Sequence, residues 1–123
     1  MGNKIVVVDD EEDNIELVRA VLSGKGFEVI TFSNGKIAVG YLEGCSELPD
    51  LLVLDMRMPE MRGINVCEEL RKNHKFDSLK IVFFTASSDL DNHLLRQYDV
   101  LGFIYKPFDI NQLVEQVRKY VKM

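Results

Sequence analysis

The sequence predicts an α/β fold, namely a doubly wound parallel sheet of five strands with helices on both faces. Short apolar runs alternate with helical patterns five times along the chain. Residues 5–8, 51–54 and 81–84 contain no polar side chain, which is typical of parallel strands covered on both sides. The connections are expected to be right-handed crossovers. With 123 residues the chain has the length of one domain, expected to span residues 3–122.

Two strand and helix pairs fill the N-terminal third of the chain. A β-branched run at residues 4–8 ends in acids, which complement the dipole at the start of a helix that stops near Gly24. A second strand at residues 27–32 leads to a helix capped by Ser33 or Asn34. The positions of these helices expected to face the core are Ile15, Val18, Val21, Leu22, Ile37, Ala38, Tyr41 and Leu42.

The remaining chain repeats the pattern three times, because each apolar or β-branched run is bounded by turn residues. The expected strands are residues 51–54, 80–85 and 102–105. The expected caps of the last two helices are Ser88 or Asp89 and Asp109 or Asn111. The apolar positions expected on the core side of the three helices are Ile64, Cys67, Leu70, Leu90, Leu94, Leu95, Tyr98, Ile110, Leu113, Val114, Val117 and Val121.

Polar residues stand where these apolar runs end. Asp9 and Asp10 follow the first strand, and Asp55 follows the third. Thr85 ends the fourth run, and Lys106 follows the fifth. Because the carboxyl ends of parallel strands share one edge of a sheet, these side chains are expected to converge on one crevice. Each alone has an ordinary structural explanation, so their joint placement is the functional signal.

Three carboxylates around a crevice repel one another, so they favour a hard divalent cation with oxygen ligands, above all Mg²⁺. Lys106 would add a positive charge, and Thr85 would add a hydroxyl donor for a phosphoryl oxygen. Asp55 is a candidate metal ligand, general base or nucleophile, and as a nucleophile it would become an aspartyl phosphate. The plainer alternative is a carboxylate that caps the next loop. The acids at residues 11–13 are expected to be the solvated start of a helix.

Composition excludes several classes of function. A net charge of -5 argues against binding to nucleic acid or to an anionic membrane. The sequence has neither a long apolar run nor the layout of a signal peptide, so a cytoplasmic protein is expected. Cys45 and Cys67 lack metal-site spacing and are expected to be reduced. His74 and His93 lie among polar residues and are expected to be solvated.

Together these residues resemble the receiver domain of two-component response regulators. The resemblance covers residues 3–122 and rests on Asp9, Asp10, Asp55, Met58, Pro59, Gly63, Thr85, Ala86, Lys106, Pro107 and Phe108. It implies a flavodoxin-like fold that takes a phosphoryl group onto Asp55 from a sensor histidine kinase or a histidine phosphotransfer protein. It also implies Mg²⁺ as the cofactor, with Mn²⁺ as a second candidate.

The resemblance assigns a role to each matching position. Thr85 and Lys106 would hold the phosphoryl oxygens, and the peptide bond between Lys106 and Pro107 is expected to be cis, which would direct the lysine into the site. The implied metal ligands are Asp10 and Asp55 directly, Asp9 through water, and the backbone carbonyl of Arg57.

The resemblance also implies a switch. On phosphorylation Thr85 would move toward the phosphoryl group, and Phe103 would swing inward behind it. Tyr105 lies on the same face of the strand, so spacing alone does not separate these two aromatic residues. The surface of the fourth helix, fifth strand and last helix would then bind an effector. Arg57 and Ser87 stand at the positions that tune the phosphoryl lifetime, which Arg57 is expected to lengthen relative to asparagine.

Three other functions fit the residues less well. A haloacid-dehalogenase-like phosphatase needs a second aspartate where this chain has Arg57, and an FMN carrier needs a hydroxyl-rich loop where it has acids. A docking module that is not phosphorylated would not need all the chemical positions. The chain is therefore expected to catalyse only its own phosphorylation and dephosphorylation. It is either a stand-alone regulator or the receiver of a larger protein.

Overall fold

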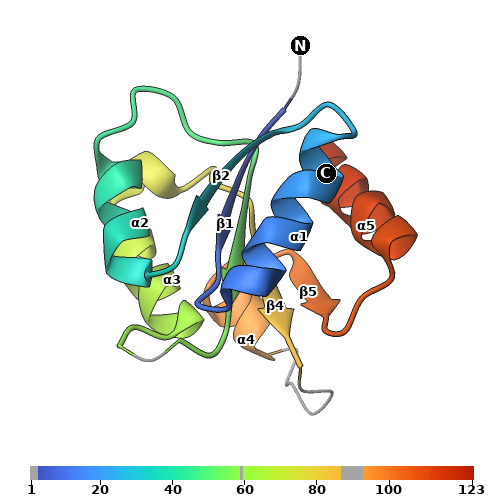
Figure 1. Cartoon of the computed structure of the whole chain (residues 1–123). Coiled ribbons are helices and arrows are strands. Elements are labelled where there is room, and N and C mark those ends of the chain that lie inside the picture. The colour runs from blue at the N-terminus through green and yellow to red at the C-terminus, as the bar shows by residue number, and fades with distance from the viewer. Residues whose placement is uncertain (1–2, 59, 87–92) are drawn as a thin grey trace.

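The computed structural model describes residues 3–58, 60–86 and 93–123. Five parallel strands form one sheet, as the sequence predicts, and their order is β2-β1-β3-β4-β5 (Figure 1). The strands are β1 (Lys4–Val8), β2 (Glu28–Phe32), β3 (Leu51–Asp55), β4 (Ile81–Thr85) and β5 (Gly102–Tyr105). The helices are α1 (Glu12–Ser23), α2 (Gly35–Glu43), α3 (Gly63–Arg71), α4 (His93–Gln97) and α5 (Ile110–Lys122), with a short 3-10 helix, η1 (His74–Phe76).

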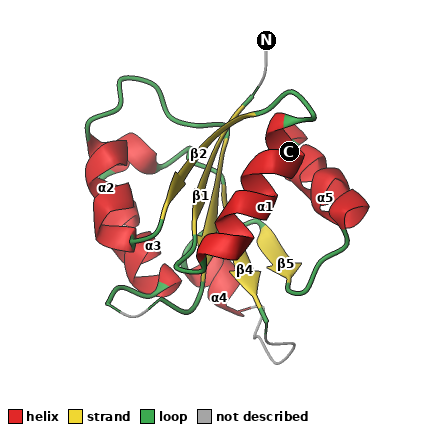
Figure 2. Ribbon diagram, viewed as in Figure 1, coloured by secondary structure: helices red, strands yellow, loops and turns green. Residues whose placement is uncertain are grey.

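Helices cover both faces of the sheet (Figure 2). α1 and α5 pack on one face, where Val18 and Leu22 meet Leu113 and Val117. α2 and α3 pack on the other face. The side chains of β3 and β4 are buried throughout, because each strand has neighbours on both sides and helices above and below. These two strands therefore give the site a rigid base.

Strand register decides which side chains meet at the carboxyl edge. Val8 of β1 pairs with Leu54 of β3, so the next residues, Asp9 and Asp55, are neighbours. Asp55 in turn pairs with Phe84 of β4, which places Thr85 one residue beyond it. The register thus brings the predicted residues of three strands to one edge.

Two of the expected core positions are wrong. Ile37 is 60% exposed and Ile110 is 49% exposed, although both fit a helical apolar stripe. In α2 the residues that reach the sheet are Ala38 and Leu42, which leaves Ile37 on the outer side. Ile110 is the first residue of α5, before the buried stripe that starts at Leu113.

The helix caps fall where the sequence allows. The side chain of Asn34 accepts hydrogen bonds from the backbone N–H groups of Lys36 and Ile37, and Asp109 accepts one from Asn111. Ser88, Asp89 and Leu90, which were expected to begin the fourth helix, lie outside the described residues. The sequence did not predict η1, which buries Phe76.

Gly63 keeps α3 close to the end of β3. A Cβ atom at this position would lie 2.6 Å from the carbonyl oxygen of Asp55 and 3.2 Å from the Cα of Met56. Both are backbone atoms, so a methyl group fits only if the loop after β3 moves. A glycine here is therefore required by close approach, not by a turn.

Gly63→Ala should destabilise the fold by about 1–3 kcal/mol, because the helix must shift away from Asp55. Gly40→Ala is the matched control, since a Cβ there meets nothing within 4 Å. It should be neutral or stabilising by up to about 1 kcal/mol. Urea unfolding compares the two variants with the wild type. Equal stability of the two variants would contradict the close approach.

Candidate phosphoryl-transfer site

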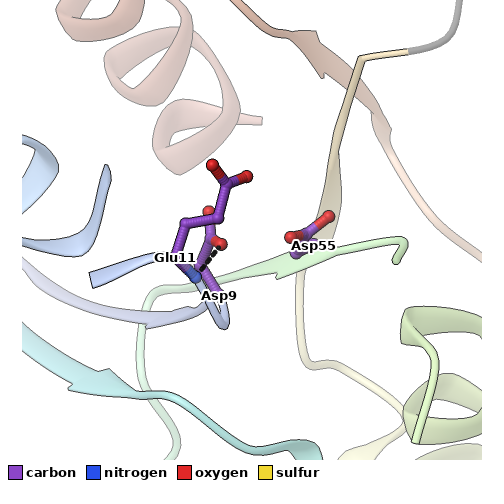
Figure 3. A group of neighbouring side chains, drawn as sticks. All are labelled: Asp9, Glu11 and Asp55. Carbon is purple, nitrogen blue, oxygen red and sulfur yellow. Dashed lines mark hydrogen bonds between the residues drawn. The ribbon is translucent and has the colours of Figure 1, made fainter. Parts of the chain in front are cut away.

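Asp9 and Asp55 are buried carboxylates at the ends of neighbouring strands (Figure 3). Asp9 is 0% exposed and Asp55 is 5% exposed. Asp9 accepts a hydrogen bond from the backbone N–H of Glu11 at 2.9 Å, and Asp55 accepts one from the backbone N–H of Arg57 at 3.0 Å. Two acids this deeply buried need a cationic partner, because an uncompensated buried charge is strongly destabilising.

Lys106 supplies that cation. Its Nζ lies 2.9 Å from Asp9 Oδ2 and 3.3 Å from Asp55 Oδ2. The backbone N–H of Lys106 donates to the carbonyl of Thr85 at 2.7 Å, so the ends of β4 and β5 are joined beside the acids. The peptide bond between Lys106 and Pro107 is cis, which confirms the expectation.

Glu11 belongs to the site in a way that its expected role as a solvated helix start does not describe. Its side chain is 66% exposed, yet Oε1 lies 3.3 Å from Lys106 Nζ. Asp9, Glu11 and Asp55 each offer a carboxylate oxygen within 4.8 Å of the others. Figure 3 shows these three side chains around the ends of β1 and β3. Hard oxygen donors this close together suit a divalent cation such as Mg²⁺.

Asp10 lies apart from those three carboxylates. It is exposed and lines a hollow of about 450 Å³ together with Arg57, Met58 and Arg62. Of the two acids that follow β1, Asp9 is the one whose carboxylate is grouped with that of Asp55. Direct metal binding by Asp10 and by the Arg57 carbonyl stays a prediction.

Burial and nearby charges shift the pKa values of Asp55 and Lys106. Burial, with the nearby charge of Asp9, raises the pKa of Asp55 to about 6, against the opposing effects of the Arg57 N–H and Lys106. Burial acts to lower the pKa of Lys106, but the carboxylates of Asp9 and Asp55 outweigh it and raise that pKa. Near neutral pH the site therefore pairs an ammonium with an ionised Asp55, the state that a nucleophile requires.

The expected switch residues lie behind the acids. Thr85 is 5% exposed at the end of β4. Phe103 is 8% exposed and stacks on Phe83 at 6.1 Å between ring centroids, so it already occupies an inward position. Tyr105 is 47% exposed, and its ring lies 6.2 Å from that of Phe103, as expected for two side chains on one face of a strand. Ser87 lies outside the described residues.

Several residues near the site were not identified from the sequence. Asn14 donates its side-chain N–H to Asp9, and exposed Leu17 lies on the same helix. With Glu11 and Lys106 they line a hollow of about 370 Å³, which is completed by Ala86, Pro107 and Phe108. The sequence shows Asn14 only as a polar residue in the first turn of α1, which does not by itself indicate a role in the site. Its contact depends on the direction in which that helix leaves β1.

The sequence matches the family described as response regulator receiver domain over residues 5–118. The chain belongs to this family of receiver domains. Regulatory protein VanRc of Enterococcus gallinarum is 34% identical over 122 residues, which cover 99% of this chain and 51% of that protein. This receiver domain therefore spans about half the length of that curated relative.

Solved structures agree with the fold of the receiver domain. Chemotaxis protein CheY4 of Vibrio cholerae has a TM-score of 0.88 at 22% identity, covering 98% of this chain and 99% of that chain. The receiver domain of sensor histidine kinase PA1611 from Pseudomonas aeruginosa PAO1 has a TM-score of 0.86 at 22% identity, covering 100% of both chains. That structure holds a magnesium ion coordinated in the active site cleft.

Other sequence expectations concern the remainder of the receiver domain. Cys45 and Cys67 are both free thiols, and burial raises the pKa of Cys67 to about 12. His74 is exposed and lies 3.1 Å from Asp77, and His93 is also exposed. Across residues 3–58, 60–86 and 93–123, no helix is long and apolar enough to cross a membrane.

Asp55→Asn should stabilise the metal-free protein near neutral pH. Folding raises the pKa of Asp55 from 3.8 to about 6, so the folded state binds the proton more tightly and unfolding free energy falls as pH rises through this interval. The variant avoids that loss and should be more stable by about 1–3 kcal/mol at about pH 8. The difference should vanish toward about pH 4.

Urea unfolding in the presence of a chelator measures this effect. Asp77→Asn is a control, because Asp77 is an exposed aspartate beside His74 that precedes β4, whereas the site lies at the carboxyl ends of the strands. A stability difference between Asp55→Asn and the wild type that does not change with pH would contradict the raised pKa.

Proposed function

We propose that this receiver domain accepts a phosphoryl group on Asp55 from a phosphohistidine of a sensor histidine kinase or a histidine phosphotransfer protein. The observation that carries the proposal is the buried Asp55 carboxylate 3.3 Å from the Lys106 ammonium, beside an open hollow. A buried carboxylate next to a fixed cation suits attack on phosphorus, because the cation offsets the charge of the incoming oxygens.

The transfer exchanges one bond for another. A carboxylate oxygen of Asp55 forms a bond to phosphorus as the bond between phosphorus and the imidazole nitrogen breaks. The electron pair of the broken bond stays on that nitrogen, and because the other ring nitrogen of the donor carries a proton, the ring leaves as neutral imidazole. Lys106 Nζ lies within reach of Asp55 Oδ2 and can donate hydrogen bonds to a phosphoryl oxygen held there. Thr85 is proposed to donate its hydroxyl to a second oxygen.

Mg²⁺ is the proposed cofactor, with Mn²⁺ as the second candidate. Asp9, Glu11 and Asp55 present carboxylate oxygens within 4.8 Å of one another, and Asp10 is the next residue after Asp9. The magnesium ion in the similar PA1611 receiver domain supports this choice. When bound, the ion would offset the negative charge that gathers between the acids and the phosphoryl oxygens.

The surfaces around the site suit two partners. The hollow beside Lys106 has exposed Leu17 and partly buried Phe108 at its walls, an apolar lining that suits the helix bearing the phosphohistidine. The effector is proposed to bind the face formed by α4, β5 and α5, where Tyr105 is exposed and Phe103 lies directly beneath. Movement of Thr85 toward the phosphoryl group, with the inward Phe103 packed behind it, would link phosphorylation to that face.

We also propose that the protein acts in the cytoplasm and catalyses only its own phosphorylation and dephosphorylation. A phosphatase acting on small esters is less well supported. Its general acid would stand at position 57, where this chain has an exposed arginine.

Incubation with acetyl phosphate and Mg²⁺ should add one phosphoryl group to the wild type and none to Asp55→Asn, because Asp55 is the proposed acceptor and Asp9, the other buried partner of Lys106, is fully covered. Intact-mass spectrometry and peptide mapping measure the modification. Asp77→Asn, the control, should be modified like the wild type. Modification at another residue, or none in the wild type under these conditions, would overturn the proposal.

Arg57→Asn should shorten the lifetime of the phosphorylated protein severalfold. Arg57 follows Asp55 by two residues, and its long cationic side chain stands exposed on the side open to water. The rate of phosphoryl loss after donor removal measures the effect. Arg118→Asn removes the same charge at the opposite end of the sheet and should leave the rate unchanged. A longer lifetime for Arg57→Asn would count against this role.

A further inference from the structure

Two arginines border the open side of the site. Arg57 lies two residues after Asp55, and Arg62 lies immediately before α3. Both line the hollow of about 450 Å³ that also contains Asp10 and Met58. The two arginine residues therefore line one hollow, although they lie five positions apart in the sequence.

The backbones of both arginines are held by hydrogen bonds. The N–H of Arg57 donates to Asp55 Oδ1 at 3.0 Å, and the N–H of Arg62 donates to Asn65 Oδ1 at 3.1 Å. The N–H of Gly63 donates to the Met56 carbonyl at 3.3 Å, which joins the two ends of this loop. Arg57 and Arg62 thus start from fixed positions beside the phosphoacceptor while their side chains extend into solvent.

Neither arginine is neutralised within the described part of the chain. The ion pairs found there involve Lys72, His74 and Lys106, and none involves Arg57 or Arg62. Both side chains therefore offer a planar set of donors suited to phosphate oxygens.

The net negative charge of the site suggests a role for Arg57 and Arg62. Three carboxylates, those of Asp9, Glu11 and Asp55, lie around the Lys106 ammonium, and Asp10 adds a fourth negative charge in the hollow that Arg57 and Arg62 line. A divalent cation would still leave an excess of negative charge. A dianionic phosphoryl group that approaches Asp55 is therefore repelled unless cations stand on its path.

We propose that Arg57 and Arg62 act as a pair that recruits the dianionic phosphoryl group of the phosphodonor before transfer. The inference rests on the proposed function and adds a second anion-binding position outside the reacting one. The pair binds the donor in the encounter complex and releases it to Lys106 and Thr85. Its contribution falls on donor affinity, not on the rate of the chemical step.

Initial rates of phosphorylation by acetyl phosphate at saturating Mg²⁺ test this pair. Arg62→Ala should raise the half-saturating concentration of acetyl phosphate roughly fivefold and leave the maximal rate within about twofold. Arg57→Ala should act similarly, and the double variant should show the larger effect and a weaker dependence on ionic strength. Arg62→Lys should restore part of the affinity. The matched control Arg118→Ala, an exposed arginine at the amino end of the strands, should match the wild type.

The same rates are measured with phosphoramidate as a second phosphodonor, because it carries less negative charge than acetyl phosphate near neutral pH. The substitutions should then change the half-saturating concentration less than they do for acetyl phosphate. Equal effects on both donors, or a wild-type half-saturating concentration in the Arg62 variant, would overturn the inference. A wild type that is not phosphorylated by either donor would instead overturn the proposed function, so the two failures are distinguishable.

Discussion

The ammonium of Lys106 lies between carboxylates that come from two strands, 2.9 Å from Asp9 and 3.3 Å from Asp55. Without it the sheet edge would hold two buried acids with no counter-charge, an arrangement that costs several kcal/mol. With it, the acids can stay ionised and close together. Two further contacts hold Lys106 in position. Its backbone N–H donates to the Thr85 carbonyl, which joins the ends of β4 and β5, and its Nζ lies 5.7 Å from the centroid of the Phe84 ring.

One ammonium does not balance the acids around it, and the function follows from that excess. Asp9, Glu11 and Asp55 present a close set of oxygens, and Asp10 stands nearby in the next hollow. Under the proposed function, such a site attracts a divalent cation and, through it, a phosphoryl group. In that proposal Arg57 and Arg62 in the outer hollow, with Lys106 beside the acids, would form a path of positive charge toward Asp55. In the metal-free protein, burial raises the pKa of Asp55 to about 6, and the negative charge of Asp9 acts in the same direction.

The sequence predicts most of this site because strand ends are easy to locate. Asp9, Asp55, Thr85 and Lys106 each abut an apolar run, and parallel topology then brings them together. The sequence did not assign Glu11 and Asn14 to the site, because their contacts depend on how the chain at the start of α1 folds back over Asp9. Ile37 was misplaced because the nine-residue helix α2 meets the sheet through Ala38 and Leu42, a choice that spacing alone does not make. Local sequence patterns thus predict where the strands end, whereas the contacts of each side chain depend on how the helices pack.

The pKa of the Lys106 ammonium, followed by NMR in the metal-free protein, tests the central contact most directly. The carboxylates of Asp9 and Asp55 should hold it above the ordinary value for lysine. Replacing Asp9 by asparagine should lower it, since the burial remains while the nearest counter-charge is lost. A wild-type pKa at or below the ordinary value, or one that Asp9→Asn leaves unchanged, would contradict the account.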